Sequence, residues 1–460
     1  MGGRGRASFR MAMTPGAWGR RTSADLARRM HLDNAFDQSV VRVASGTLAA
    51  QAITVAVSPV LTRLFTPTDF GIYAAAVTIF SLVLVGASLR YQAAIPLPPD
   101  EDTAASLILL SALLGLVTTV LMAVCLWVFG PWIAHALGAP GLIPLFWVVV
   151  LSELGASLYQ VVSAWAIRAQ AYGPIAQTRI AQGVGMAAGQ VVFGLLGAAP
   201  SGLLYGDAIG RTAGIWGLAH RMWHASGSAI RTTTWSRLRQ SAIRYRRFPA
   251  YSLPASLLDA ISNQAPLILL LVLYGPAVGG YFLLAQRVGS LPVRLIGASV
   301  AQVFFGEASR LVQEDRAALP ALFTRTVRRM AVVGAVPTIL LAVVGPTLFP
   351  FVFGENWEVA GIYLALLAPT FYFLFIWGSV SGAVDVAERQ NLLLIGELVG
   401  LGLVTGAVGL GRLAGVDSTG AVVLLAIASS WTSVIYVGIS WLAITRPVAS
   451  HAIEHAGGSR

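Results

Sequence analysis

The sequence predicts an all-α, polytopic membrane protein of about 12 transmembrane helices, arranged as two six-helix bundles related by a parallel pseudo-two-fold repeat. The composition is 56% hydrophobic and only 11% charged over 460 residues, which lies outside the balance of a soluble domain. Apolar stretches of roughly 20 residues also recur along most of the chain, each long enough to cross the hydrocarbon layer. A motif near the start of the first half returns in the second half.

Twelve candidate spans follow in chain order. A transmembrane β-barrel would need polar and apolar residues to alternate, and these stretches lack that period, so helices are expected. The predicted spans are 40–61, 70–97, 104–129, 142–165, 175–198, 200–220, 251–273, 279–305, 330–353, 359–383, 391–411 and 420–443. They divide the chain into a basic leader (1–39), a first bundle (40–220), a basic linker (221–250), a second bundle (251–443) and a tail (444–460). The leader is expected to be disordered or to lie on the membrane surface, with no cleaved signal peptide.

The distribution of arginine predicts the orientation in the membrane. The chain has no lysine, and its net charge is +11. With the N-terminus in the cytoplasm, 24 of the 31 arginines fall in inward segments or, for Arg179, just inside the inward end of a predicted span, and only Arg63 and Arg412 fall in outward loops. This is the positive-inside bias, so both termini are expected to be cytoplasmic. Most of these arginines are expected to meet anionic membrane lipid, and no nucleic-acid partner is predicted.

The two halves share a motif at a constant offset of 209 residues. The stretches "FTPTDFGIY" and "YGPAVGGYF" align Pro67 with Pro276 and Gly71 with Gly280, both in the outward turn after a half's first helix. A weaker sequence similarity pairs Gly138 with Gly354. Because six helices is an even number, the halves have the same orientation, and two such bundles can rock around a central cavity. The repeat therefore favours a transporter that works by alternating access.

Arginines inside the predicted spans are candidates for ligand contact, because a charge near the bilayer centre normally faces water, a partner or a ligand. Arg287 and Arg294 share a helix face, and Arg294 lies too deep to reach the membrane border easily. Arg90 lies about 10 Å from the cytoplasmic border, so snorkelling and ligand contact are both open. The predicted intramembrane arginines are Arg42, Arg90, Arg211, Arg287 and Arg294.

Four carboxylates also fall inside the spans. Asp207 and Arg211 are four residues apart and predict an ion pair on one helix face. Glu153, Asp259 and Glu397 are candidate counter-ions or coupling groups that carry a proton, and sequence does not separate these roles. Five arginines against four carboxylates favours an anionic cargo, since the guanidinium fork binds phosphate oxygens in pairs.

Few residues suggest catalysis or a bound cofactor. Cys125 is the only cysteine, which excludes disulfides within the chain and cysteine metal clusters. His451 and His455 on the tail lack further ligands nearby. No nucleophile stands beside a base, and the outward loops are short. We therefore expect no metal, no cofactor and no enzymatic activity.

Four segments resemble the oligosaccharide and polysaccharide flippase family, which shares a superfamily with multidrug and toxin extrusion transporters and lipid II flippases. They are "SPVLTRLFTPTDFGIYAAAVTIFSLVLVGASLRYQAAIPLP", "FPAYSLPASLLDAISNQAPLILL", "YGPAVGGYFLLAQRVGSLPVRLIGASVAQVFF" and "FGENWEVAGIYLALLAP", within residues 40–445. The resemblance implies a multidrug-and-toxin-extrusion-like fold in the bacterial inner membrane. It also implies that a lipid-linked oligosaccharide, usually on undecaprenyl pyrophosphate, moves to the outer leaflet for lipopolysaccharide or exopolysaccharide assembly. Glycosyltransferases and a polysaccharide polymerase are the implied partners.

This resemblance suggests roles for the arginines. Arg90 is expected to load the pyrophosphate from the cytoplasmic side, while Arg287 and Arg294 hold it nearer mid-membrane. Gln92 stands where the resemblance implies a glutamate in many members, so this chain lacks that acidic group. Three alternatives stay open: a proton- or sodium-coupled drug exporter on the same fold, a membrane glycan polymerase or ligase, and a structural partner of a glycan assembly complex.

Overall fold

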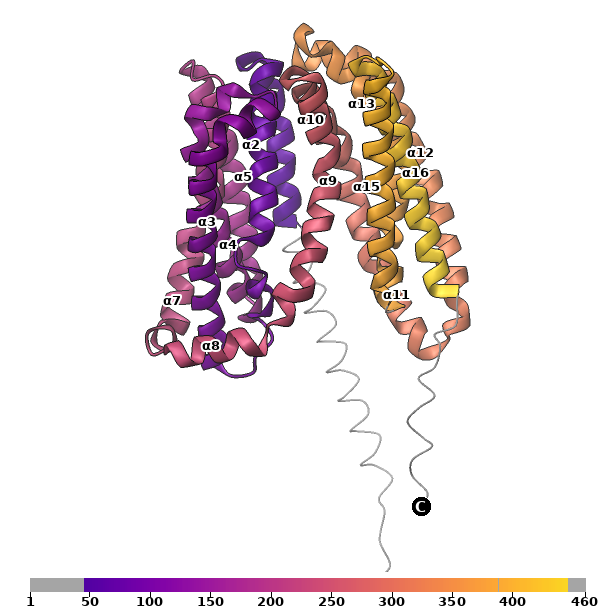
Figure 1. Cartoon of the computed structure of the whole chain (residues 1–460). Coiled ribbons are helices and arrows are strands. Elements are labelled where there is room, and N and C mark those ends of the chain that lie inside the picture. The colour runs from indigo at the N-terminus through magenta and orange to yellow at the C-terminus, as the bar shows by residue number, and fades with distance from the viewer. Residues whose placement is uncertain (1–44, 388, 446–460) are drawn as a thin grey trace, which may run out of the picture.

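The predicted fold class is confirmed: the computed structural model describes residues 45–387 and 389–445, and their regular secondary structure is entirely helical. One bundle is formed by a first helix, Ser45–Leu64, followed by α2 (Pro67–Gly86), α3 (Glu101–Ala136), α4 (Phe146–Arg168), α5 (Tyr172–Leu195), α6 (Ser201–Thr212) and α7 (Ile215–Arg231). The other contains α9 (Leu253–Tyr274), α10 (Pro276–Pro292), α11 (Ala298–Glu314), α12 (Leu319–Phe353), α13 (Glu358–Val380), α14 (Gly382–Val386), α15 (Gln390–Leu413) and α16 (Ser418–Thr445). Helix α8 (Trp235–Arg244) crosses the end of the first bundle and leads to the second (Figure 1).

Nine helices of the described residues are long and apolar enough to cross a membrane. They account for nine of the predicted spans. The other three correspond to α5, to α6 with α7, and to α10 with α11. These segments carry more polar residues or are shorter than a full crossing, and α5 and α10 line the polar cavities described below. The predicted leader, most of the tail, and Arg42 with them lie outside the described residues.

Three predicted spans are interrupted in the structure. The span 70–97 was expected to be one helix, but α2 ends at Gly86 and a short 3-10 turn, η1 (Tyr91–Ala94), follows. The span 200–220 breaks at Gly214, whose φ of 73° ends α6 and begins α7. The span 279–305 contains a π-helical segment, η4 (Val293–Gly297), between α10 and α11. Hydropathy does not detect such breaks, because they change the backbone without changing the polarity of the segment.

The two bundles meet at the end of the molecule that carries the turns at residues 65–66 and 275, which we call the closed end. Their ribbons diverge toward the opposite end, near α8 (Figure 1). At the closed end, the indole of Trp357 donates a hydrogen bond of 3.0 Å to the backbone oxygen of Thr62, across the two halves. Phe70 packs edge-on against Trp357 with ring centroids 4.8 Å apart. A buried hydrogen bond and an aromatic contact therefore link the halves here.

The repeated glycines form a reciprocal contact at the closed end. A Cβ at Gly71 would lie 1.8 Å from the carbonyl oxygen of Pro276. A Cβ at Gly280 would lie 2.0 Å from the carbonyl oxygen of Pro67. Each glycine thus packs against the proline that begins the equivalent helix of the other half. The motif repeats because α2 and α10 meet across the pseudo-two-fold axis, and only glycine allows their backbones to approach so closely.

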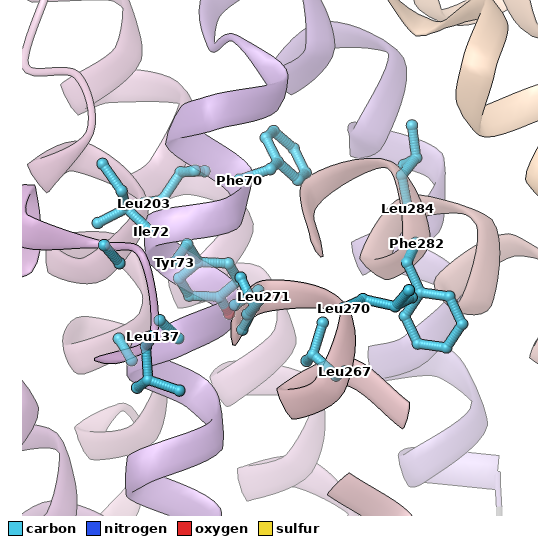
Figure 2. Close-up of a cluster of buried hydrophobic side chains, with 14 of the residues drawn as sticks. Phe70, Ile72, Tyr73, Leu137, Leu203, Leu267, Leu270, Leu271, Phe282 and Leu284 are labelled. Carbon is cyan, nitrogen blue, oxygen red and sulfur yellow. The ribbon is translucent and has the colours of Figure 1, made fainter. Parts of the chain in front are cut away.

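The hydrophobic core is continuous between the halves beneath this contact. Figure 2 shows Phe70 and Tyr73 of α2 in the same cluster as Leu267 and Leu271 of α9 and Phe282 of α10. All five side chains are almost fully buried.

The end opposite the closed end is rich in arginine, and we call it the arginine-rich end. Here side chains at the start of α3 bind α7 and α8 to the first bundle. The Ser226 hydroxyl of α7 donates to the Glu101 carboxylate, and Arg237 of α8 forms an ion pair of 2.9 Å with Asp102. Arg168 at the end of α4 lies 3.6 Å from Glu101. Helices α7 and α8 are therefore part of the first bundle, and the connection to the second bundle is the π-helical segment η3 (Phe248–Ser252).

Asp100 caps α3 at this end. Its carboxylate accepts a hydrogen bond of 2.8 Å from the backbone nitrogen of Thr103. Hydrogen bonds from Thr103 hold the pKa of the Asp100 carboxyl below its ordinary value. The cap is therefore ionised at neutral pH, when it complements the positive N-terminal end of the helix dipole.

Candidate substrate cavity between the two halves

A polar cavity of about 420 Å³ lies between the halves. One wall is the first helix, and the other walls are α9 and α10. Gln264 of α9 reaches across the halves and donates a hydrogen bond of 2.7 Å to the hydroxyl of Ser81 on α2. The polar side chains of the lining are Gln51, Thr54, Asn263, Gln264, Gln286, Arg287 and Ser290. Amides and hydroxyls can both donate and accept hydrogen bonds, so this lining suits a ligand with many hydroxyl groups.

Arg287 supplies the positive charge of this cavity. One of its terminal nitrogens is buried and has no hydrogen-bond partner among the described residues. Its guanidinium carbon lies 6.0 Å from the centroid of the Phe70 ring. No carboxylate of the described residues forms an ion pair with it. A partly buried guanidinium without a protein counter-charge can bind an anionic group that enters the cavity.

The other predicted ligand contact on this helix is Arg294. Its backbone lies in the π-helical segment η4, seven residues after Arg287. Its side chain lies outside what the structure describes, so its role stays a prediction. Short π-helical segments often occur at functional sites.

A second polar cavity, of about 370 Å³, lies inside the first bundle. Gln51 and Thr54 line both cavities, so the two adjoin at the first helix. In the second cavity Arg211 forms an ion pair with Asp207 on the same helix. Asp207 also accepts a hydrogen bond of 3.0 Å from the Tyr73 hydroxyl. This arginine is therefore already neutralised by the protein.

Arg179 is a cavity residue that the sequence prediction missed. It lies on α5 and lines the second cavity, with its guanidinium carbon 5.0 Å from the centroid of the Tyr159 ring. Its buried Nε has no hydrogen-bond partner among the described residues. The residue falls near the start of a predicted span, where an arginine is ordinarily assigned to the membrane border. Its position four residues inside the predicted span 175–198 is the only signal that could have identified it.

Glu153 on α4 is fully buried in the first bundle, and neither carboxylate oxygen has a hydrogen-bond partner among the described residues. Arg211 is the charged residue that interacts electrostatically with the Glu153 carboxyl group. A buried carboxyl group is costly to ionise without partners, which suits a group that gains and loses a proton. The structure thus places Glu153 beside the Asp207 and Arg211 pair.

Asp259 and Glu397 line a third cavity, of about 730 Å³, between α9 and α15 in the second half. Asn263, one turn after Asp259, donates a hydrogen bond of 2.9 Å to its carboxylate. Glu397 is hydrogen-bonded to Tyr436 of α16. Among the described residues no three of His, Cys, Asp and Glu are placed to hold a metal ion.

Arg90 lies in a strained turn at the arginine-rich end and not within a helix. Leu89 and Arg90 both have positive φ values, 50° and 67°. The Nε of Arg90 lies 3.4 Å from the hydroxyl of Ser252, at the start of the second half, and Ser252 lines the third cavity. The turn is fixed from both sides, since Gln92 donates a hydrogen bond of 2.9 Å to Gln160 of α4. Arg90 therefore lies where the two halves are connected, apart from Arg287.

Comparison with known proteins supports this architecture. Residues 60–361 match the model of a family described as "Polysaccharide biosynthesis protein". No curated protein matches the sequence.

Three solved structures share the fold at low sequence identity. The lipid II flippase MurJ in an inward closed conformation has a TM-score of 0.60 at 13% identity, with 86% of each chain covered. A eukaryotic MATE transporter, AtDTX14, has a TM-score of 0.57 at 15% identity, with 88% of this chain and 95% of that chain covered. A mutant of the Vibrio cholerae MATE transporter VcmN has a TM-score of 0.54 at 12% identity, with 90% and 96% covered. These likenesses establish the two-bundle fold.

Proposed function

Because the chain belongs to the polysaccharide biosynthesis protein family, we propose that it is a flippase that moves a lipid-linked oligosaccharide from the inner to the outer leaflet. The carrier is proposed to be of the undecaprenyl-pyrophosphate type, and the membrane to be the bacterial inner membrane with both termini in the cytoplasm. The observation that carries the proposal is the buried terminal nitrogen of Arg287, which has no hydrogen-bond partner among the described residues and lies in an amide-lined cavity between the halves.

The cavity suits such a cargo in two ways. The Arg287 guanidinium offers a charged fork for phosphate oxygens, which remains ionised at any relevant pH. The amides and hydroxyls around it offer partners for sugar hydroxyls. The protein in this scheme is a transporter and not an enzyme, and the halves rock about the cavity.

The polar groups away from the cavity are proposed to couple this motion to an ion. Glu153 and the third-cavity pair of Asp259 and Glu397 are buried or cavity-facing carboxyl groups on different elements. Each is a candidate to bind a proton or a cation. In this proposal Arg90 guides the pyrophosphate at the arginine-rich end, where it already bonds to Ser252 of the second half.

The test is to delete the gene in its host and measure lipid-linked oligosaccharide and surface polysaccharide by mass spectrometry. The flippase predicts that the lipid-linked form accumulates while the surface polymer falls. A leaflet assay then separates the flippase from a polymerase, because only loss of the flippase leaves the accumulated form on the inner leaflet. Unchanged levels of both, in a strain without a second flippase, would contradict the proposal, and a gain in drug sensitivity would favour the exporter.

A further inference from the structure

Three arginines on α12 continue a membrane-facing surface of the second bundle. Val332, Val336 and Val343 are 68%, 71% and 68% exposed, and their spacing places them on one helix face. An exposed apolar face on a transmembrane helix contacts lipid. Arg325 and Arg329 extend the same face toward the arginine-rich end at spacings of four and three residues.

The length of α12 places these arginines at the edge of the hydrocarbon. The segment from Met330 to Phe353 is apolar and spans about 35 Å at 1.5 Å per residue, enough to cross the bilayer core. Arg325, Arg328 and Arg329 precede it by at most about a turn and a half. Their side chains are thus at the depth of the lipid phosphates.

A tryptophan from the neighbouring helix completes the site. Trp441 of α16 packs on the Phe323 ring with centroids 5.6 Å apart, and Phe323 is itself buried against Phe304. Trp441 is therefore held in place and still partly exposed. Trp at the boundary between head groups and hydrocarbon is typical of lipid contact.

The three arginines and Trp441 line a groove of about 910 Å³ that also includes Val332 and Val333. None of the three arginines has an acidic partner among the described residues. Arg310 on α11 differs, because Glu307 and Glu314 neutralise it. The groove thus combines uncompensated positive charge with an apolar wall.

We propose that this groove binds one anionic phospholipid from the leaflet at the arginine-rich end. The arginines would hold its phosphate, and an acyl chain would lie along the valine face of α12. Basic pockets between transmembrane helices bind anionic head groups in this way. The site is on the outside of the second bundle, away from the cavity between the halves, so the proposal does not depend on which cargo is transported.

The test uses native mass spectrometry of the full-length protein in detergent, with phosphatidylglycerol, phosphatidylcholine and undecaprenyl phosphate as probes. The wild type is expected to retain phosphatidylglycerol and to lose phosphatidylcholine. The triple variant Arg325→Gln, Arg328→Gln, Arg329→Gln is expected to bind phosphatidylglycerol at least tenfold more weakly, since each arginine near the surface contributes about fivefold. These side chains have no acidic partner in the described residues, so the variant should fold.

A matched control removes three other exposed arginines: Arg221→Gln, Arg239→Gln, Arg246→Gln. It has the same net charge as the test variant and is expected to keep its phosphatidylglycerol affinity within about twofold. Equal binding by the test variant and the wild type would overturn the site, as would an equal loss in the control. Retention of undecaprenyl phosphate alone would also overturn it, because the groove would then serve the lipid carrier of the cargo.

Discussion

The two bundles share a fold and each places an arginine inside the protein, but the two arginines have different surroundings. Arg211 in the first bundle is bonded to Asp207, which also accepts from Tyr73. Arg287 in the second half faces the cavity between the halves with a buried nitrogen that has no partner among the described residues. The first charge is satisfied by the protein, whereas the second is left for something that enters. We therefore expect Arg211 to stabilise the first bundle and Arg287 to be available to a ligand.

The largest effect should come from breaking the paired charge. Asp207→Ala leaves the partly buried Arg211 guanidinium without its ion-pair partner, and removing one partner of a buried pair ordinarily costs about 3–5 kcal/mol. We expect a large drop in the unfolding temperature of the purified protein in detergent, whatever substrate is present. The double variant Asp207→Asn, Arg211→Gln should recover much of the loss, because no lone charge remains. A double variant as unstable as Asp207→Ala would contradict the interpretation of these residues as a structural pair.

The unpaired charge should behave in the opposite way. Arg287→Gln removes no ion pair of the described residues, so stability should change little. Hydrogen bonds to a charged group contribute about 1.5–3 kcal/mol, so transport should fall about 10- to 100-fold. The measurement is flipping of a labelled polyprenyl-diphosphate oligosaccharide in proteoliposomes. Arg287→Lys should be intermediate, because it keeps the charge and loses the planar fork.

A control for this prediction is Arg412→Gln at the closed end, where the side chain stacks on Tyr274 at 5.4 Å. It should transport as the wild type does. Normal flipping by Arg287→Gln would remove the distinction between the two arginines, and with it the main support for the substrate cavity.

Substitutions at the closed end test whether the two halves contribute equally to the contact between α2 and α10. Gly71→Ala and Gly280→Ala each place a Cβ about 2 Å from a backbone oxygen of the other half, so the helices must move apart. Such overpacking ordinarily costs about 1–3 kcal/mol. Because the contacts are reciprocal, the two variants should shift the population toward opening at this end by similar amounts. Distances between spin labels on α2 and α10 would measure this shift.

Gly306→Ala is the control, since a Cβ there meets no atom within 4 Å. It should leave the label distances unchanged. If the label distances shifted in only one of the two glycine variants, the two halves would not contribute equally to opening, despite their sequence repeat.

The sequence predicted the helical class, the two bundles and the repeated turns, because hydropathy and repeated glycines reflect local and pairwise constraints. It placed Asp207 beside Arg211 for the same reason, since four residues make one helical turn. It did not find Arg179, because burial of a residue near a span's end depends on what packs over it. It also extended one helix through Arg90, because the two left-handed residues there are not glycines.

The smallest effect is expected at that turn. Arg90→Gly and Arg90→Ala both lose the bond to Ser252, so any difference between them reports the backbone. A left-handed conformation raises the free energy of a residue with a Cβ by about 1 kcal/mol or more, whereas glycine adopts it without this cost. Arg90→Gly should therefore be more stable than Arg90→Ala by about 1 kcal/mol in thermal unfolding. At Arg239, inside helix α8, the order should reverse, because glycine destabilises a helix relative to alanine. If alanine were the more stable residue at both positions, the turn at Arg90 would not be left-handed, and its bond to the second half would need another geometry.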